Sequence, residues 1–141
     1  MKKIILSLFL FSFLFFSFGV CEAAVNSYDK YGIKTGSYRK TSSGFNVYDQ
    51  YGSKTGSYRK TSSGYNSYDK NGAKTGSYRK TSLGYNEYDK YGRKTGSYKT
   101  GSNGVTTKYD AYGRKIGSFK KDSSGRVTEY DKNGRKVGSY R

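Results

Sequence analysis

The sequence contains no histidine, proline or tryptophan, and only one cysteine among 141 residues. Without His, the commonest general base and metal ligand of proteins is missing. The single Cys rules out a disulfide framework within the chain. Acidic residues are also scarce, with 10 Asp and Glu against 27 Lys and Arg, so a carboxylate cage for a cation would lack negative charge. These absences predict a protein that is not an enzyme and needs no cofactor or metal.

Large aliphatic side chains are also scarce beyond residue 23, where only ten Ile, Leu, Val and Phe residues remain. By composition alone this is typical of a disordered chain. The regular placement of tyrosine argues the other way, and all 17 Tyr lie in this part of the sequence. Any fold must therefore bury tyrosine in place of an aliphatic core.

Residues 1–23 have the pattern of a secretory signal peptide. Lys2 and Lys3 precede a short apolar and Ser-rich stretch, which ends in small residues. We expect cleavage after Ala23, which would leave residues 24–141 secreted, at the cell surface or in the periplasm of a bacterium. An uncut anchor and a lipoprotein attached through Cys21 are the alternatives, and the bulky Val20 disfavours the second.

Near-copies of "YDKYGRKTGSY" fill residues 24–141, with Tyr-Asp pairs near residues 28, 48, 68, 88, 109 and 130. Periods of this length indicate stacked repeats. Each unit contains two turn signals, Asp-x-(Tyr/Asn)-Gly and Thr-Ser-Ser-Gly, separated by segments rich in Tyr and Thr. The chain is therefore predicted to be all-β, an antiparallel meander of repeated hairpins with about twelve short strands. Its sheet could be an open single layer or coiled.

The loops predict which residues face one another. Both turns suit a three-residue loop that ends in a left-handed Gly. Such loops would pair Tyr48 with Lys54 and Tyr58 with Tyr68, and would place these residues on one face of the sheet.

Two units are 21 rather than 20 residues long, and their second turns read "SNGV" and "DSSGR". Two-residue loops at these places would pair Tyr98 with Tyr109 and Phe119 with Tyr130. We therefore expect each insertion to bring a change of loop class that preserves the aromatic pairs.

The recurring Tyr-Asp with a Gly three residues after the Asp resembles the YD repeats of Rhs-type proteins, as does "YDxxGRK" at Tyr88, Tyr109 and Tyr130. The resemblance covers nearly all of residues 24–141, and short MORN-like hairpin repeats are a competing one. YD repeats form β-hairpins that coil into an extracellular shell or stalk, and some are associated with carbohydrate binding or with enclosing a toxin. With about six units here, the resemblance implies a small extracellular scaffold rather than an enclosure.

Tyrosines and cations on one predicted face form a candidate binding surface. Aromatic rows bind sugars or bases, and dense positive charge attracts polyanions. The candidate residues are Tyr48, Lys54, Tyr58, Lys60, Tyr68, Lys74, Tyr78, Lys80, Tyr88, Lys94, Tyr98 and Tyr109. The alternative is that the rings only replace a core and that the Lys side chains only form a solvated face.

These features predict a non-enzymatic structural or adhesive protein that binds polyanions or glycans outside the cytoplasm. Lipopolysaccharide, teichoic acid, acidic polysaccharide and extracellular DNA are the candidate partners. The alternative function is a self-assembling β-fibre subunit, because the terminal strands of an open sheet would be unpaired edges.

Overall fold

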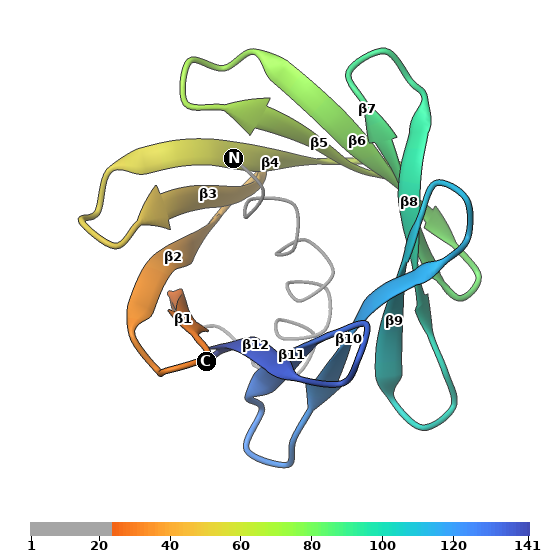
Figure 1. The fold of residues 1–141 in the computed structure, drawn as a ribbon. Helices are drawn as coiled ribbons and strands as arrows, with labels where there is room; N and C mark the ends of the chain where they lie inside the picture. Colours follow the sequence, from red (N-terminus) through yellow and green to blue (C-terminus); the bar gives the residue numbers. More distant parts are fainter. Residues whose placement is uncertain (1–23) are drawn as a thin grey trace.

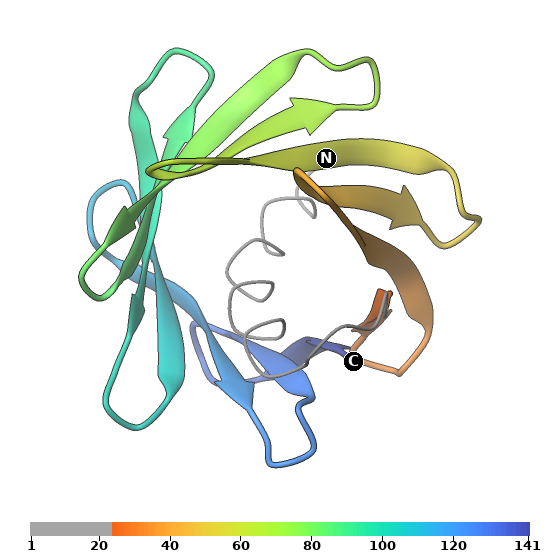
Figure 2. The same ribbon diagram turned by 180° about the vertical axis from the view of Figure 1, so that it is seen from behind.

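The computed structural model describes residues 24–141, which form one closed antiparallel β-barrel. The predicted signal peptide at residues 1–23 lies outside the described residues. Figure 1 looks along the barrel, and Figure 2 shows the same ring of strands from behind. In residues 24–141 no helix is long and apolar enough to cross a membrane.

Twelve strands follow one another around the barrel in chain order. They are β1 (Val25–Asp29), β2 (Lys34–Thr41), β3 (Gly44–Asp49), β4 (Lys54–Thr61), β5 (Gly64–Asp69), β6 (Lys74–Thr81), β7 (Gly84–Asp89), β8 (Lys94–Thr100), β9 (Val105–Asp110), β10 (Lys115–Lys121), β11 (Val127–Asp131) and β12 (Lys136–Tyr140). The predicted all-β meander of about twelve short strands is confirmed. The open single-layer sheet is wrong, because the sheet closes.

The barrel closes where β1 pairs with β12, seen in Figure 1 as the orange strand beside the blue one. Ser27 lies opposite Tyr140 in this pair. The backbones of Asn26 and Arg141 exchange two hydrogen bonds, of 2.7 and 3.0 Å. The expectation of unpaired terminal strands is therefore wrong, and the fibre alternative loses the free edges on which it was based.

The Tyr-Asp turns have the predicted three-residue loop. In the turn after β3, the Asp49 N–H donates to the Ser53 carbonyl at 2.9 Å and the Gly52 N–H donates to the Asp49 carbonyl at 3.2 Å. Gly52 has a φ of 87°. Asp49 Oδ1 accepts from the Tyr51 and Ser53 amides at 2.9 and 2.8 Å, which satisfies the loop amides.

The Thr-Ser turns are one residue shorter than predicted. Thr61 pairs directly with Gly64, so only Ser62 and Ser63 form the loop. Gly64 is the first residue of β5, with a φ of 150°. A Cβ at this position would collide with the backbone carbonyl of Tyr78 on the neighbouring strand, which explains the glycine.

This one-residue difference moves the paired residues to opposite faces of the sheet. Tyr58 lies opposite Ser67, and Ser57 lies opposite Tyr68, so the predicted Tyr58–Tyr68 pair is wrong. The tyrosine of each Gly-Ser-Tyr segment faces the interior, as Tyr58 does, and the tyrosine of each Tyr-Asp pair faces outward, as Tyr68 does. The prediction that all these tyrosines share one face is therefore wrong as well.

The first 21-residue unit has a three-residue loop instead of the expected two-residue loop. Gly101 N–H donates to the Val105 carbonyl at 3.0 Å, which leaves residues 102–104 as the loop. Tyr98 therefore lies opposite Lys108, and its predicted pairing with Tyr109 is wrong.

The second insertion repeats this arrangement, with residues 123–125 as the loop. Phe119 lies opposite Glu129, and the predicted pairing with Tyr130 is wrong. Each insertion does bring a change of loop class, as predicted, but it does not preserve a facing aromatic pair, because the buried ring lies opposite Lys108 in one unit and Glu129 in the other. The loop classes are the reverse of those predicted, because the 20-residue units have two-residue loops and the 21-residue units have three-residue loops.

Aromatic rings fill most of the barrel interior. Buried rings from the even-numbered strands are Tyr38, Tyr58, Tyr78, Tyr98, Phe119 and Tyr140. Rings of successive repeats contact one another, with centroid distances of 6.1 Å for Tyr58–Tyr78 and 6.5 Å for Tyr65–Tyr85. Aromatic pairs at such distances stabilise a core beyond their buried area. Tyrosine thus replaces the missing aliphatic core, as the composition required.

Candidate functional site

The predicted binding residues divide among three parts of the barrel. Those on the outer wall are Tyr48, Tyr68, Tyr88 and Tyr109 with Lys54, Lys74 and Lys94. Those in the interior are Tyr58, Tyr78 and Tyr98. Lys60 and Lys80 lie near the Thr-Ser turns, in positions opposite Tyr65 and Tyr85. The predicted set is therefore not one surface, and only its outer-wall part presents tyrosine and lysine together.

A cation is stacked on the outer tyrosine at successive repeats. Arg59 on β4 lies over the ring of Tyr68 on β5, with 4.8 Å from the guanidinium carbon to the ring centroid. The same arrangement occurs, at 4.6 to 5.4 Å, in the pairs Arg39–Tyr48, Arg79–Tyr88, Lys99–Tyr109 and Arg141–Tyr28. The arginines are exposed, so the ring orients a guanidinium whose N–H donors remain available to a ligand. The predicted set of binding residues includes none of these cations, although each occupies a fixed place in its repeat.

A second cation lies across the sheet from each outer tyrosine. Lys54 is opposite Tyr48, and Lys74 is opposite Tyr68, as predicted. Five outer rings are thus flanked by a stacked cation on one strand and a lysine on the other, namely those of Tyr28, Tyr48, Tyr68, Tyr88 and Tyr109. In residues 24–141 this wall has no acidic side chain, because Asp residues occupy turns and both Glu residues face inward.

The turn aspartates are already used by the backbone. In each of the seven turns that contain one, Asp Oδ1 accepts two backbone N–H bonds from its own loop. Asp89 and Asp110 also pair with Arg93 and Arg114, at 2.8 and 2.6 Å. The backbone hydrogen bond from Arg93 is the main cause of the lowered pKa of Asp89.

One inward position varies strongly between repeats, namely the residue before each Tyr-Asp pair. Its occupants are Ser27, Val47, Ser67, Glu87, Lys108 and Glu129. Each lies between a buried aromatic residue and a glycine, as Ser67 lies between Tyr58 and Gly76. Sequence reasoning missed this interior belt, because the sequence shows that the position varies from Ser and Val to Glu and Lys but not that it faces inward.

Glu87 is the most buried acid of the belt, with 7% of its surface exposed. Its carboxylate accepts hydrogen bonds from the hydroxyls of Tyr78 and Tyr98, at 3.3 and 3.5 Å. Burial raises the pKa of Glu87, while the nearby Lys108 ammonium and the two hydroxyls act in the opposite direction. Burial also raises the pKa of both tyrosines, so both remain hydrogen-bond donors.

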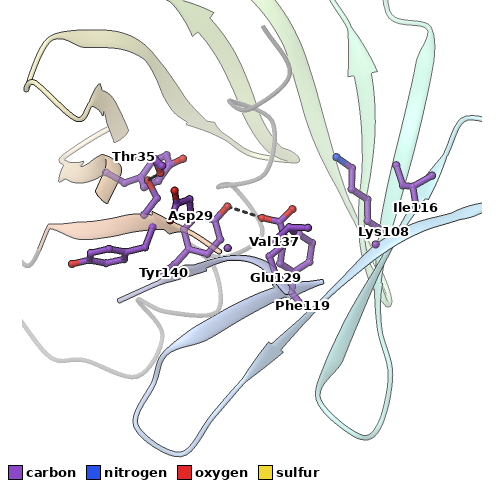
Figure 3. A pocket seen from close by; sticks show the side chains of 13 residues that line it. Asp29, Thr35, Lys108, Ile116, Phe119, Glu129, Val137 and Tyr140 are labelled. Atoms are coloured by element: carbon purple, nitrogen blue, oxygen red, sulfur yellow. Dashed lines mark hydrogen bonds between the residues drawn. The ribbon is translucent and has the colours of Figure 1, made fainter. Parts of the chain in front are cut away.

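Glu129 occupies the equivalent position on β11. Its Oε2 accepts a hydrogen bond from the Tyr140 hydroxyl at 3.1 Å, and Figure 3 shows these two side chains pointing toward one another. Burial raises the pKa of Glu129, opposed by the Tyr140 hydrogen bond and by Lys108. Lys108 Nζ also lies 5.4 Å from the centroid of the Tyr98 ring.

Two interior cavities adjoin these acids. One, of about 270 Å³, is lined by residues that include Glu129, Lys108 and Thr35. The other, of about 260 Å³, is lined by residues that include Glu87 and Thr75. Each could hold ordered water or a small polar molecule. Thr35 and Thr75 follow Tyr-Asp turns, so both cavities lie toward that end of the barrel.

Comparisons of the chain with protein-family models, with curated proteins and with solved structures found no match. Within residues 24–141, no three His, Cys, Asp or Glu side chains are grouped so that they could hold a metal ion. The candidate binding surfaces are therefore the outer wall and the rims of the barrel.

Proposed function

We propose that this protein is an exported, non-enzymatic binding protein whose outer wall holds polyanionic polymers. The observation that carries the proposal is the repeated stack of an exposed cation on an outward tyrosine, with a lysine across from the same ring. We also propose that the chain is a short member of the YD-repeat family with a structural or adhesive role.

Charge separation supports this proposal. Residues 24–141 carry 25 Lys and Arg and 9 Asp and Glu, a net charge of +16. The two Glu residues face the interior and the Asp oxygens bind loop amides, so the cations of the outer wall have few internal partners. Such a surface attracts polyanions and loses affinity steeply as salt rises.

The spacing of the stacks fits an extended polymer better than a single small anion. Arg39, Arg59 and Arg79 lie on β2, β4 and β6, two strands apart. Neighbouring strands are separated by about 4.8 Å, which places successive stacks on the order of 10 Å apart across the wall. A planar guanidinium also binds phosphate, sulfate or carboxylate through two parallel hydrogen bonds. Phosphate or sulfate polymers, including nucleic acids, teichoic acids and acidic polysaccharides, meet these requirements.

Binding to heparin and to labelled single-stranded DNA, measured over a range of salt concentrations, tests the proposal. The test variant is Arg39→Gln/Arg59→Gln/Arg79→Gln. The matched control is Lys40→Gln/Lys60→Gln/Lys80→Gln, which removes the same charge one residue further along the same strands, on the opposite face.

The arginine variant is expected to lose more affinity than the lysine variant. On DNA, the slope of log affinity against log salt should fall by about 0.7 for each phosphate that the variant no longer neutralises. Equal losses in the two variants would show that net charge alone attracts the polymer and would reject the outer-wall site. Affinity that does not change with salt would reject polyanion binding altogether.

A further inference from the structure

The two ends of the barrel differ in chemistry. The Tyr-Asp rim consists of the turns at residues 29–33, 49–53, 69–73, 89–93, 110–114 and 131–135. The Thr-Ser rim consists of the turns at residues 41–44, 61–64, 81–84, 101–105 and 122–126. Because successive turns of a meander alternate between ends, all the turns of one kind lie at the same end.

Four tips of the Tyr-Asp rim present a tyrosine to solvent. Their exposed fractions are 76% for Tyr31, 84% for Tyr51, 72% for Tyr91 and 86% for Tyr112. Ile33 lies in the first of these turns and is 62% exposed. These rings contribute almost nothing to the buried core, so packing does not explain their presence.

The turn itself does not need the tyrosine either. The third and sixth repeats have Asn71 and Asn133 at the same place. The Asn71 amide donates to Asp69 Oδ1 at 2.9 Å, just as the Tyr31 amide donates to Asp29 Oδ1 at 2.9 Å. The following glycines have the same φ of 85° in both turns. Asparagine thus serves the fold equally well at these tips.

Cations surround the exposed rings. Exposed cations in these turns or at the first residue of the next strand are Lys30, Lys34, Lys54, Lys70, Lys74, Lys90, Arg93, Lys94, Arg114, Lys115, Lys132, Arg135 and Lys136. Lys30 Nζ is 4.7 Å from the centroid of the Tyr31 ring, and Lys90 Nζ is 4.9 Å from that of Tyr91. These 13 cations outnumber the six aspartates of the same turns, so the Tyr-Asp rim combines aromatic rings with a net positive charge.

The tips of the Thr-Ser rim present no aromatic ring, although Lys40, Lys60, Lys80 and Lys121 lie immediately before these turns. Their loop residues are Ser, Asn, Gly and one leucine, without charge or aromatic ring. Asp122 and Arg126, which flank the last of these loops, carry opposite charges. Leu83 is the single large apolar side chain at these tips, at 58% exposure, and serine occupies its place at Ser43 and Ser63. The barrel therefore presents two ends of different chemistry on one scaffold.

We infer that the Tyr-Asp rim docks onto an anionic lipid surface. Tyrosine favours the boundary between apolar chains and water, where its ring and hydroxyl are both satisfied. Lys and Arg near such a surface are attracted by anionic headgroups. The tips form a ring at one end of the barrel, so they can contact a flat surface together. An extended polymer fits the outer wall better. This docking shares Lys54, Lys74 and Lys94 with the polymer site, but its four exposed tyrosines belong to the rim alone and have no part in that site.

Vesicle binding of the purified protein tests this inference. Vesicles of phosphatidylcholine with phosphatidylglycerol are compared with vesicles of phosphatidylcholine alone. The test variant is Tyr31→Asn/Tyr51→Asn/Tyr91→Asn/Tyr112→Asn, which copies the chain's own Asn71 and Asn133 and keeps the net charge. The control variant is Leu83→Ser, which copies Ser43 and Ser63 on the other rim. Circular dichroism and melting curves establish that both variants are folded.

The protein is expected to sediment with anionic vesicles only. The tyrosine variant should bind them about tenfold more weakly, while Leu83→Ser should bind like the unchanged protein. Equal binding by the tyrosine variant, or equal binding to neutral vesicles, would overturn the inference. The variant should keep its affinity for heparin; an equal loss there would mean that the rim takes soluble polymer instead of lipid.

The sequence contains no tryptophan, so the fluorescence of a single introduced tryptophan gives a second readout of docking. Tyr51→Trp should show a blue shift of its fluorescence on anionic vesicles, since the ring would leave water. Leu83→Trp on the opposite rim should show no shift. A shift in the Leu83→Trp variant alone, or in both variants, would contradict docking through the Tyr-Asp rim.

Discussion

The inner and outer walls of this barrel use tyrosine for different purposes. Tyr58 faces inward with 2% of its surface exposed, and its ring contacts Tyr78 of the next repeat. Tyr68, on the next strand, faces outward, is only partly buried and lies beneath Arg59. The same residue type is therefore a core element in one place and a platform for a cation in the other.

The difference arises from the position of each tyrosine relative to the pleat of the sheet. Side chains alternate between faces along a strand, so sheet pairing decides which tyrosines enter the barrel. Changes that break the inner wall should be costly to stability. Changes on the outer wall should be tolerated by the fold and should alter binding instead.

The largest effect is expected from truncating an inner ring. Tyr58→Ala should lower the free energy of unfolding by about 3–5 kcal/mol, the range measured when large aromatic side chains are removed from cores. Tyr68→Ala should cost about 1 kcal/mol, near the centre of the range for point substitutions, because its ring is only partly buried. Urea unfolding of the two variants measures both values, and similar costs would contradict the assignment of inner and outer faces.

A smaller effect is expected from adding a methyl group to the inner wall. A Cβ on Gly76 would lie 2.5 Å from the Tyr88 carbonyl oxygen, so Gly76→Ala should cost about 1–3 kcal/mol. The next residue, Ser77, faces outward, and Ser77→Ala should change stability by less than about 0.5 kcal/mol. Thermal melting of the pair checks this, and a tolerated alanine at position 76 would show that the strands can separate there.

The buried acid of the inner wall should make stability depend on pH. Burial raises the pKa of Glu87 above its ordinary value of 4.5. The folded protein should therefore lose stability as pH rises from about 4.5 through the raised pKa, because the unfolded state gives up its proton first. Glu87→Gln removes this titration, so its stability relative to the unchanged protein should increase over that window and then level off.

Urea unfolding at a series of pH values measures the pH effect, with Glu129→Gln as the comparison. Glu129 is less buried than Glu87, so its variant should show the same trend with a smaller amplitude. A Glu87→Gln variant whose relative stability is constant with pH would show that the carboxylate has no desolvation cost in the barrel.

The smallest effect is expected from the outer stack itself. A double-mutant cycle of Arg59→Gln and Tyr68→Leu should give a coupling energy of about 0.5–1 kcal/mol, the usual size of an exposed cation–π contact. Arg39 and Tyr68 belong to different stacks, and their cycle should give a value near zero. A coupling near zero for Arg59 and Tyr68 would show that the ring does not orient the guanidinium.

Local sequence was enough to predict the strands and one of the two turns. Asp49 bonds the amides of its own loop and Gly52 adopts a left-handed conformation, as expected from short-range chemistry alone. The Thr-Ser turn was predicted one residue too long. Its Gly64 is needed because the Tyr78 carbonyl approaches from the neighbouring strand, which no local pattern reveals.

The one-residue error in the length of the Thr-Ser turn explains why the candidate site was only partly predicted. With the longer loop, Tyr58 and Tyr68 would share a face, and the predicted binding set would form one surface. With the shorter loop, the outer tyrosines lie beneath arginines and the inner ones surround Glu87 and Glu129. Neither the stacks nor the interior belt could be read from the sequence until the register was known.

By itself the sequence determined the repeat, the strands, the Tyr-Asp turns and the need to bury tyrosine, because these depend on residues close together in the chain. The tertiary structure alone decided the register, the closure of β1 on β12 and the face on which each tyrosine lies. The reason is that pairing depends on contacts between backbones distant in sequence, where a shift of one residue exchanges the inside of a sheet with its outside.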